Sequence, residues 1–452
     1  MDVNNKRVTV VGLGLMSGGA AVAQYLASRG AVVTVTDSAD SETLAPEVAK
    51  LGDSSVDNIH LGRLTAEDFC NAEIVVANPT IPPNDWFLSL AARNGAAITT
   101  ELEIVLQNCP GRIIAVTGAA GKSTTVSMIQ TILQASATSQ RHNEKTISYT
   151  PRCFGTADAT HSVLADLAFV RAEDFVVLEV SSQQLARVSN AVYSPEVAVV
   201  TNSQPDGLTW HGTFDHFVKC TQKLLRLQSP SDVTVMDLAD AELSSWQRQI
   251  RGRHINPAAE NCIPELQVIG RHNYENARLA AATCLAVGCS SASVTVGLKE
   301  FPGLPHRLEV IPSVVGRTVI NDATANSPCR TAAALAAVKS PVTLLLMPGN
   351  SRDLDWEPML AAFSDRVRQV GLVGSAAAEL SHKLQLANPG LPVQHLDSIV
   401  DATAWGLSNS QWGDTLLLSP AATHCRSYSS PDQLGREFAA AVAEFSRERT
   451  LL

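Results

Sequence analysis

The sequence predicts an α/β protein of three domains, each built on an open and mostly parallel sheet. Short β-branched runs alternate with helical stretches along the 452 residues, which is typical of parallel sheets with crossover helices. Glycine-rich turns follow two of these runs, at residues 12–19 and 118–121. We expect a Rossmann-like N-terminal domain, a central phosphate-loop ATPase domain and a C-terminal Rossmann-like α/β domain. Segments containing Pro and Gly place their borders at 1–110, 111–305 and 306–452.

The composition argues against a nucleic-acid-binding protein and against a membrane protein. Hydrophobic residues make up 45% and charged residues 17% of the chain, as in folded globular proteins. The net charge of −10 argues against a nucleic-acid-binding surface. The nine cysteines include no Cys-x-x-Cys pair, which favours reduced thiols. The first residues lead directly into a predicted strand, and no apolar run is long enough to cross a bilayer. We therefore expect a cytoplasmic protein with no nucleic-acid or membrane partner.

The first domain opens with a complete βαβ unit. A strand over Arg7–Val11 runs into the glycine-rich turn, a helix follows over Ala20–Arg29, and a second strand over Ala31–Thr36 ends at Asp37. A glycine-rich first turn and an acid after the second strand favour nucleotide binding over a plain turn. Further strands are expected at residues 59–61, 74–77 and 98–101, the middle one ending in the proline-rich loop 78–83.

The phosphate loop dominates the second domain. A strand over Ile113–Val116, the turn around Gly118 and Gly121, and a helix over Thr124–Ala135 give the required order, and the polar stretch 136–149 is expected to be a loop. Lys122 would reach the terminal phosphates of a nucleotide, and the Ser123 hydroxyl would bind Mg²⁺. The alternative is a glycine-rich turn with a surface lysine, because the loop is one residue shorter than the usual Walker spacing. The predicted nucleotide-binding residues here are Gly118, Ala119, Ala120, Gly121, Lys122, Ser123 and Thr124.

A carboxylate for the metal is expected at Glu179. The apolar strand from Phe175 ends in this acid, as strands that anchor Mg²⁺ do in phosphate-loop enzymes. The alternative role for Glu179 is to cap a neighbouring helix. Ser123 and Glu179 are the predicted metal ligands, and Mg²⁺ is the predicted metal. Farther on, residues 214–227 are expected to form one helix.

The third domain again alternates strands and helices. Strands are expected at residues 318–321, 342–347, 367–373, 393–396 and 415–418. Polar residues follow them, where open parallel sheets build their sites. These residues are Asp322, Arg352, Asp355, Ser419 and His424.

Motifs along nearly the whole chain make it resemble the Mur ligase family. They are Gly12-Leu13-Gly14, Thr117–Thr125, Leu178–Ser182, Thr201-Asn202, Pro205-Asp206, Trp210-His211-Gly212, His272–Ala277, Phe301–Arg307, Asn321-Asp322 and Leu417–Ala421. The resemblance is greatest to the members that add D-glutamate to UDP-N-acetylmuramoyl-L-alanine. It implies that ATP phosphorylates the substrate carboxylate and that the incoming amine displaces phosphate. The cofactors would be ATP and Mg²⁺, and the catalytic residues would be Lys122 and Glu179.

The resemblance also implies roles for individual residues. Leu15 and Asp37 would lie near the uridine, Asn273 would face the adenine, and Arg307 and Asp322 would hold the phosphate and ribose region. The predicted substrate-binding residues are Leu15, Asp37, Ser182, Arg352 and Ser419. The partners would be a UDP-sugar peptide precursor and an amino acid, and we expect a monomer.

Several positions depart from the family's pattern. Ala120 replaces an Asn of the phosphate loop. Gly207 replaces a His that binds a second Mg²⁺, and Thr221 replaces a carbamylated Lys that supports the same metal. In the third domain the family has Lys at Thr324 and Arg352, and Ser at His424. These departures fall on the second metal site and on the amino-acid pocket.

Two other functions therefore stay open. One is a degenerate paralogue that binds a nucleotide and acts as a regulatory or partner subunit, which Gly207, Thr221 and Thr324 favour. The other is a related ligase of the folylpolyglutamate synthetase kind. The complete N-terminal βαβ unit speaks against the second alternative, because folate ligases lack that domain.

Overall fold

The computed structural model divides the chain into two compact units. One comprises Met1–Pro264 with Asn276–Glu300, and the other comprises Glu265–Glu275 with Phe301–Leu452. The structure describes residues 2–14, 18–52, 56–143, 150–155, 162–189, 194–259, 263–312, 316–349, 354–363, 366–422, 428 and 430–450. The predicted site residues Leu15, Arg352 and His424 lie outside these ranges.

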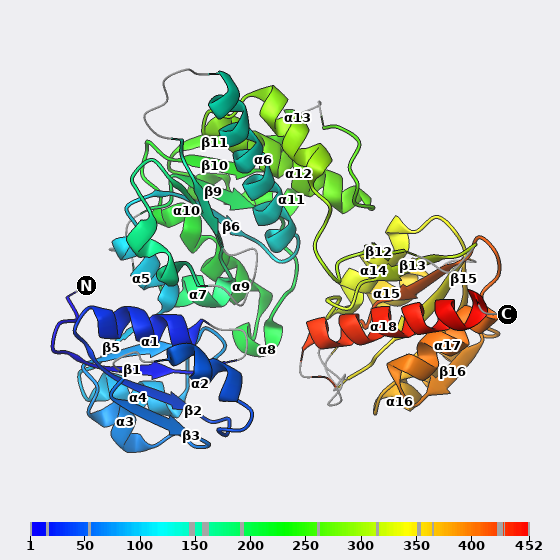
Figure 1. Cartoon of the computed structure of the whole chain (residues 1–452), viewed down its shortest axis with the longest axis horizontal. Helices are drawn as coiled ribbons and strands as arrows, with labels where there is room; N and C mark the ends of the chain where they lie inside the picture. The colour runs from blue at the N-terminus through cyan, green and yellow to red at the C-terminus, as the bar shows by residue number, and fades with distance from the viewer. Residues whose placement is uncertain are drawn as a thin grey trace. The chain divides into compact units, whose positions relative to one another are not determined.

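The N-terminal domain is a parallel five-stranded sheet in the order β3-β2-β1-β4-β5, with helices on its faces (Figure 1). Its strands are β1 Arg7–Val11, β2 Val32–Asp37, β3 Asn58–Leu61, β4 Ile74–Ala77 and β5 Ala97–Thr99, and its helices are α1 Gly19–Ser28, α2 Ala45–Leu51, α3 Ala66–Cys70, α4 Trp86–Arg93 and α5 Glu101–Asn108. The strand order reverses between β1 and β4, which is where such sheets bind ligands. The predicted Rossmann-like architecture is confirmed.

One predicted strand end in this domain is wrong. The strand expected over residues 98–101 stops at Thr99, and Glu101 begins α5 instead. Thr100 is the reason, because its hydroxyl accepts a hydrogen bond from the Glu103 backbone N–H at 3.4 Å and caps the helix.

The central domain is a parallel six-stranded sheet in the order β11-β10-β9-β6-β8-β7. The strands are β6 Arg112–Thr117, β7 Cys153–Gly155, β8 Phe175–Glu179, β9 Val197–Val200, β10 Val233–Met236 and β11 Arg253–Ile255. The helices are α6 Lys122–Asn143, α7 Ser182–Arg187, α8 Leu208–His211, α9 Phe214–Thr221, α10 Lys223–Leu227, α11 Ala241–Ser245, α12 Arg271–Ala286 and α13 Ser291–Glu300. Four single turns of 3₁₀ helix lie at Val163–Ala165, Leu167–Phe169, Trp246–Gln249 and Pro257–Ala259. Because β6 lies between β8 and β9, the segments after all three strands meet at one edge of the sheet.

Two helix predictions in this domain need correction. The helix after the phosphate loop extends to Asn143, through residues 136–143 that we expected in a loop. That stretch is polar but contains no Gly or Pro, so nothing in it breaks a helix.

The helix expected over 214–227 is interrupted at Gln222, between α9 and α10. There the Thr221 hydroxyl donates to the Phe217 carbonyl at 2.9 Å, a contact that bends helices.

The third domain is a six-stranded sheet in the order β12-β13-β17-β14-β15-β16, parallel except for β12 at one edge. The strands are β12 Glu309–Ile311, β13 Thr318–Asn321, β14 Val342–Leu346, β15 Val367–Val373, β16 Val393–Leu396 and β17 Thr415–Leu418. The helices are α14 Pro328–Ala337, α15 Glu357–Ala362, α16 Ala377–Ala387, α17 Ile399–Asn409 and α18 Pro431–Thr450. Buried side chains form an apolar core on each face of the sheet, with Leu344 in one and Leu345 in the other. The prediction of three α/β domains with parallel sheets is thus confirmed.

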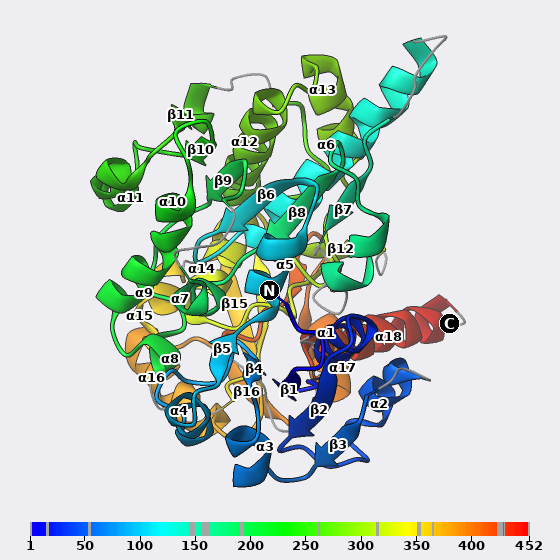
Figure 2. The same ribbon diagram turned by 90° about the vertical axis from the view of Figure 1, so that its left-hand side faces the viewer.

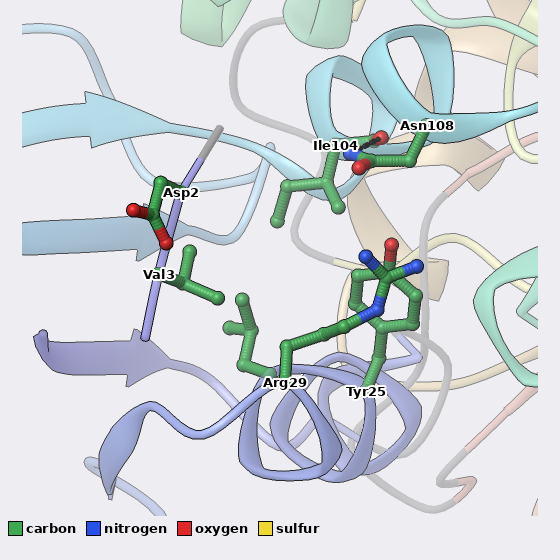
Figure 3. Close-up of a pocket in the computed structure, with 7 residues that line it drawn as sticks. Asp2, Val3, Tyr25, Arg29, Ile104 and Asn108 are labelled. Carbon is green, nitrogen blue, oxygen red and sulfur yellow. Dashed lines mark hydrogen bonds between the residues drawn. The ribbon is translucent and has the colours of Figure 1, made fainter. Parts of the chain in front are cut away.

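A small pocket lies in the N-terminal domain, between α1, α5 and the first residues (Figure 3). The Arg29 guanidinium lies over the Tyr25 ring, 5.0 Å from its centre, and both face Ile104 and Asn108 of α5. The pocket's volume of about 100 Å³ is small beside the roughly 300–1,000 Å³ of typical ligand sites. Asp37 and the glycine-rich turn do not line it, so we assign it no nucleotide.

Across the described ranges, no helix combines the length and apolar character that a membrane crossing requires.

Candidate active site

The phosphate loop needs glycine at two positions. The backbone of Gly118 has φ +131° and that of Gly121 has φ +82°, both in a region that side chains disfavour. A Cβ on Gly118 would lie 2.2 Å from the Thr201 hydroxyl oxygen, and one on Gly121 would lie 2.4 Å from Asn276 Oδ1. The loop is therefore packed against its neighbours so closely that only hydrogen fits at these two positions.

Two residues that follow β9 hold the loop in place. Asn202 accepts the backbone N–H of Ala120 at 3.0 Å and donates its amide to the Ala120 carbonyl at 3.0 Å. The Thr201 hydroxyl donates to the same carbonyl at 2.6 Å. The N–H of Ala119 donates to the Asn202 carbonyl at 3.3 Å. The amides of Ala119 and Ala120 thus fix the loop to the segment after β9, and the predicted contact of these residues with a nucleotide is untested.

Lys122 lies over the turn that it follows. Its ammonium nitrogen donates to the carbonyls of Gly118 at 2.8 Å and Ala119 at 3.0 Å. The side chain is half-buried. The positive charge is therefore held directly beside the loop, where the phosphates of a nucleotide would bind.

The side chains of Ser123 and Glu179 lie within hydrogen-bonding distance of each other. The register of β6 on β8 places Val116 opposite Glu179, so the acid ends its strand beside the loop. The Ser123 hydroxyl donates to Glu179 Oε2 at 2.5 Å. A hydroxyl and a carboxylate are hard oxygen donors of the kind that Mg²⁺ takes, so the pair fits this metal. At α7 the N-cap is Ser181, whose hydroxyl accepts the Gln184 N–H, so this helix does not require Glu179 as its cap.

Ser182 begins α7, three residues after the end of β8 at Glu179. Its hydroxyl lies 2.8 Å from His211 Nε2 and donates to Gln183 Oε1 at 3.2 Å. The side chain is buried. That Ser182 contacts a substrate stays a prediction, and in the structure its hydroxyl connects α7 to α8.

Asp37 organises the glycine-rich turn of the N-terminal domain. Its Oδ2 accepts the backbone N–H of Leu13 at 2.9 Å and that of Gly14 at 3.3 Å. Its Oδ1 accepts the N–H of Ala39 at 2.9 Å. Gly12 has φ +92°, and a Cβ there would lie 3.0 Å from the amide nitrogen of Asn78. The acid after β2 therefore shapes the loop after β1, and its predicted contact with a uridine is untested.

In the second unit, Asp322 and Ser419 form a buried pair. The Ser419 hydroxyl donates to Asp322 Oδ2 at 3.0 Å and lies 2.8 Å from the Thr331 hydroxyl. The Leu308 N–H donates to Asp322 Oδ1 at 3.2 Å. Because Ser419 is fully buried here, it positions Asp322, and its direct contact with an amino acid stays a prediction.

Asn273 and Arg307 lie in the same unit. The amide of Asn273 is buried and donates to the Ile269 carbonyl at 2.7 Å, at the start of α12. Arg307 is half-buried, and its charge acts on the Asp322 carboxyl. Their predicted contacts with adenine and phosphate are untested.

Burial shifts the pKa of the Asp322 carboxyl. It raises the pKa of the carboxyl from 3.8 to about 7, against the hydrogen bonds from Ser419 and Leu308. A carboxyl whose folded-state pKa lies above its unfolded value stabilises the fold at low pH, and this contribution is lost as pH rises from about 4 to about 7. We therefore expect the stability of Asp322→Asn, measured relative to that of the wild type, to be higher at pH 8 than at pH 5.

The measurement is the difference in Tm between variant and wild type at these two pH values. Asp397→Asn, at an exposed position of the same unit, controls for the loss of an acidic charge. A Tm difference for Asp322→Asn that does not grow with pH would contradict the raised pKa.

Gly207 and Thr221 occupy the two positions where the family has groups that support a second Mg²⁺ ion. Gly207 has φ +59° at the start of α8, and a Cβ there would lie 2.9 Å from the Gln183 side-chain amide. Thr221 is fully buried, and its hydroxyl is used within α9. Neither position offers an imidazole or a carboxylate to a metal.

Known protein families match each of the three domains of this chain. The Mur ligase MurD-like N-terminal domain matches residues 6–100, the Mur ligase middle domain matches 116–262, and the Mur ligase glutamate ligase domain matches 306–422. The chain is 29% identical to a UDP-N-acetylmuramoylalanine–D-glutamate ligase of Roseiflexus sp. (strain RS-1), over 99% of this chain and 100% of the relative. It is 28% identical to the protein of the same name from Symbiobacterium thermophilum, over 98% of each chain.

Solved structures share the fold. UDP-N-acetylmuramate-alanine ligase MurC from Thermotoga maritima aligns over 99% of this chain and 100% of its own, with a TM-score of 0.62 and 17% identity. MurF ligase from the same organism, solved in complex with ADP, aligns over 84% of this chain and 97% of its own, with a TM-score of 0.55 and 14% identity. Since three family models match successive domains and relatives align over the full length, the chain belongs to the Mur ligase family of ATP-dependent peptide ligases.

Proposed function

We propose that the protein joins D-glutamate to UDP-N-acetylmuramoyl-L-alanine in peptidoglycan precursor synthesis, using ATP and Mg²⁺. The observation that carries this proposal is the constellation on the phosphate loop, where Lys122 lies over the turn and Ser123 meets Glu179 at 2.5 Å. The full-length relatives that carry this activity in their names support the choice of substrate. Such a protein would act in the cytoplasm, and we propose that it acts as a monomer.

The chemistry requires activation of a carboxylate. Hydroxide is a poor leaving group, so the γ-phosphoryl group of ATP moves to a carboxylate oxygen of the substrate and ADP forms. The amine of the amino acid then attacks the carbonyl carbon, the bond from that carbon to the phosphate oxygen breaks, and the nitrogen loses a proton. The products are an amide, ADP and phosphate.

The chain's own residues have distinct tasks in this scheme. Lys122 offsets the negative charge that spreads over the transferred phosphoryl group. Ser123 and Glu179 would hold Mg²⁺, which supplies a positive charge between the phosphates when it is bound. Asn202 and Thr201 keep the loop in its binding shape, so that little reorganisation is needed when the nucleotide enters.

The other domains would bind the remaining partners. In the N-terminal domain, Asp37 fixes the glycine-rich turn that would receive the UDP moiety. In the second unit, Asn273, Arg307 and Asp322 would contact ATP, and Arg352 and Ser419 would contact the amino acid. These assignments follow the family's pattern, except that Arg352 stands where the family has Lys.

A degenerate paralogue that binds nucleotide without turnover is the second candidate. The observation that favours it is the loss of metal-binding groups at Gly207 and Thr221. Such a protein would keep the phosphate loop and bind ATP as a regulatory or partner subunit.

One assay separates the two candidates. The purified protein is given ATP, Mg²⁺ and UDP-N-acetylmuramoyl-L-alanine, and ADP release is measured with and without D-glutamate. We expect release that depends on D-glutamate, together with a product whose mass is larger by one glutamyl residue. L-Glutamate is the matched control for the acceptor. ATP binding without any amide product would support the paralogue.

A further inference from the structure

Three side chains with metal-binding atoms converge in the central domain, apart from the phosphate loop's own ligands. One potential ligand atom each from His211, His216 and Cys220 lies within 4.8 Å of the other two. His211 ends α8, and His216 and Cys220 lie one turn apart on α9. His211 and Cys220 are buried and His216 is half-buried, so the cluster is open to solvent on one side.

The elements that carry the cluster pack together. Helix α9 contacts both α7 and α8, and Figures 1 and 2 show the three helices side by side at one end of the central sheet. The rings of His211 and His216 meet edge to face with centres 5.2 Å apart, and Phe217 packs its ring edge to face on His211 at 5.5 Å. The Phe217 ring therefore supports the imidazole of His211 on its buried side.

Neighbouring hydrogen bonds determine which nitrogen of His211 carries its proton. Ser182 donates its hydroxyl proton to Gln183 Oε1 at 3.2 Å. The Ser182 oxygen, 2.8 Å from His211 Nε2, therefore accepts a proton from that nitrogen. In the neutral ring this leaves the lone pair of His211 on Nδ1, which lies 3.3 Å from Nδ1 of His216.

The same reasoning applies to His216. Its Nδ1 lies 3.1 Å from the His211 carbonyl oxygen, which can only accept a hydrogen bond. Nδ1 of His216 therefore carries the proton, and Nε2 has the lone pair. That Nε2 lies 3.5 Å from Cys220 Sγ. Both rings thus keep their outer N–H on a protein oxygen, as metal-bound histidines do.

The donor set points to one kind of metal. Two imidazoles and a thiol favour a borderline-soft cation such as Zn²⁺, whereas Mg²⁺ takes oxygen ligands. Tetrahedral zinc with Zn–N of about 2.0–2.1 Å and Zn–S of about 2.3 Å separates its nitrogen and sulfur ligands by roughly 3.5 Å. The spacing of 3.5 Å between His216 Nε2 and Cys220 Sγ already matches this geometry.

The charge states fit as well. Burial and the neighbouring His216 lower the pKa of His211, which keeps its ring neutral and its lone pair available. Burial raises the pKa of the Cys220 thiol, while the charges of Lys223 and Arg226 act in the other direction. Metal binding would therefore displace the thiol proton to solvent, as it does at other zinc–cysteine sites.

We propose that His211, His216 and Cys220 bind one Zn²⁺ ion, with water as the fourth ligand. The site is independent of the proposed Mg²⁺ at Ser123 and Glu179, because it shares no residue with that pair. Since its ligands come from α8 and α9, and His211 is held by Ser182 of α7, the ion links the three helices. Its role is to stabilise this corner of the central domain.

Cobalt substitution tests the proposal on the full-length protein. The protein is stripped with a chelator and titrated with Co²⁺, and the absorption is followed for the charge-transfer band of a cobalt–thiolate bond. We expect the band to saturate at one Co²⁺ per chain and to disappear when Zn²⁺ is added. We also expect Zn²⁺ to raise the Tm of the stripped protein where the same concentration of Mg²⁺ does not.

Two variants locate the site. Cys220→Ser should abolish the thiolate band, and His216→Asn should weaken Co²⁺ binding at least tenfold. Cys70→Ser, at an exposed cysteine of the N-terminal domain, is the matched control and should keep the band. Absence of the band in the wild type would overturn the proposal without reference to any variant. A band that survives Cys220→Ser would also overturn it.

Discussion

Lys122→Ala is expected to reduce ATP-dependent turnover by about 10³-fold or more, while the protein stays folded. Removal of a single neutral donor to a developing negative charge costs roughly 10²–10³-fold in other enzymes, and Lys122 contributes a full positive charge. Its ammonium already lies on the loop, bonded to the carbonyls of Gly118 and Ala119. ADP release in the ligase assay measures the loss, and Tm reports on the fold.

The control for this variant is Lys383→Ala. Lys383 is a partly exposed lysine that pairs with Glu379 one helical turn away, so its removal takes one ammonium from the surface of α16. We expect it to leave ADP release unchanged. Wild-type turnover in Lys122→Ala would show that the loop does not bind the reacting phosphates.

Glu179→Gln is expected to raise the Mg²⁺ concentration needed for half-maximal activity at least tenfold. Glutamine has nearly the same shape and keeps an oxygen that can accept the Ser123 hydroxyl, so the change removes mainly the negative charge. Two unit charges 4 Å apart attract by about 4 kcal/mol at an effective dielectric constant of 20. A tenfold change corresponds to about 1.4 kcal/mol, so the lost attraction is large enough.

Glu173→Gln is the matched control, because Glu173 is exposed in the turn that precedes the same strand. Its Mg²⁺ titration should follow that of the wild type. If the titration of Glu179→Gln is also unchanged, Glu179 is not a metal ligand and the Ser123–Glu179 hydrogen bond is only structural.

The two variants also distinguish the proposed ligase from a nucleotide-binding paralogue. In a paralogue without turnover, both substitutions would change ATP binding and there would be no ADP release to lose. In the ligase, Lys122→Ala and Glu179→Gln reduce a measurable rate. The Zn²⁺ site makes separate predictions, since Cys220→Ser removes no group that we place on ATP or on a substrate.

The sequence by itself determined the elements that depend on local chemistry. The strand over Arg7–Val11 and the strand over Ile74–Ala77 have the predicted bounds, because short apolar β-branched runs next to turn residues leave few other conformations. The phosphate loop was also predictable, since its glycines, lysine and serine are neighbours in the chain. Even so, the end of α6 at Asn143 was missed, because a polar stretch without Gly or Pro is compatible with both loop and helix.

Only the tertiary structure decided which distant residues meet. Strand order places Glu179 on one side of the loop and Thr201 and Asn202 on the other, and the sequence could predict only the first. It could not predict that Asp37 would hold the turn after β1, or that Ser419 would be buried behind Asp322.

The cluster of His211, His216 and Cys220 depends on both sequence and tertiary structure. The sequence places the three residues within ten positions, and the spacing of His216 and Cys220 sets them one turn apart on the helix expected over 214–227. Only the packing of α8 on α9, together with the hydrogen bond that His211 donates to Ser182, brings a ligand atom of His211 to this pair. Distances between residues on different elements follow from how the helices and the sheet pack, and local sequence preferences contain little of that information.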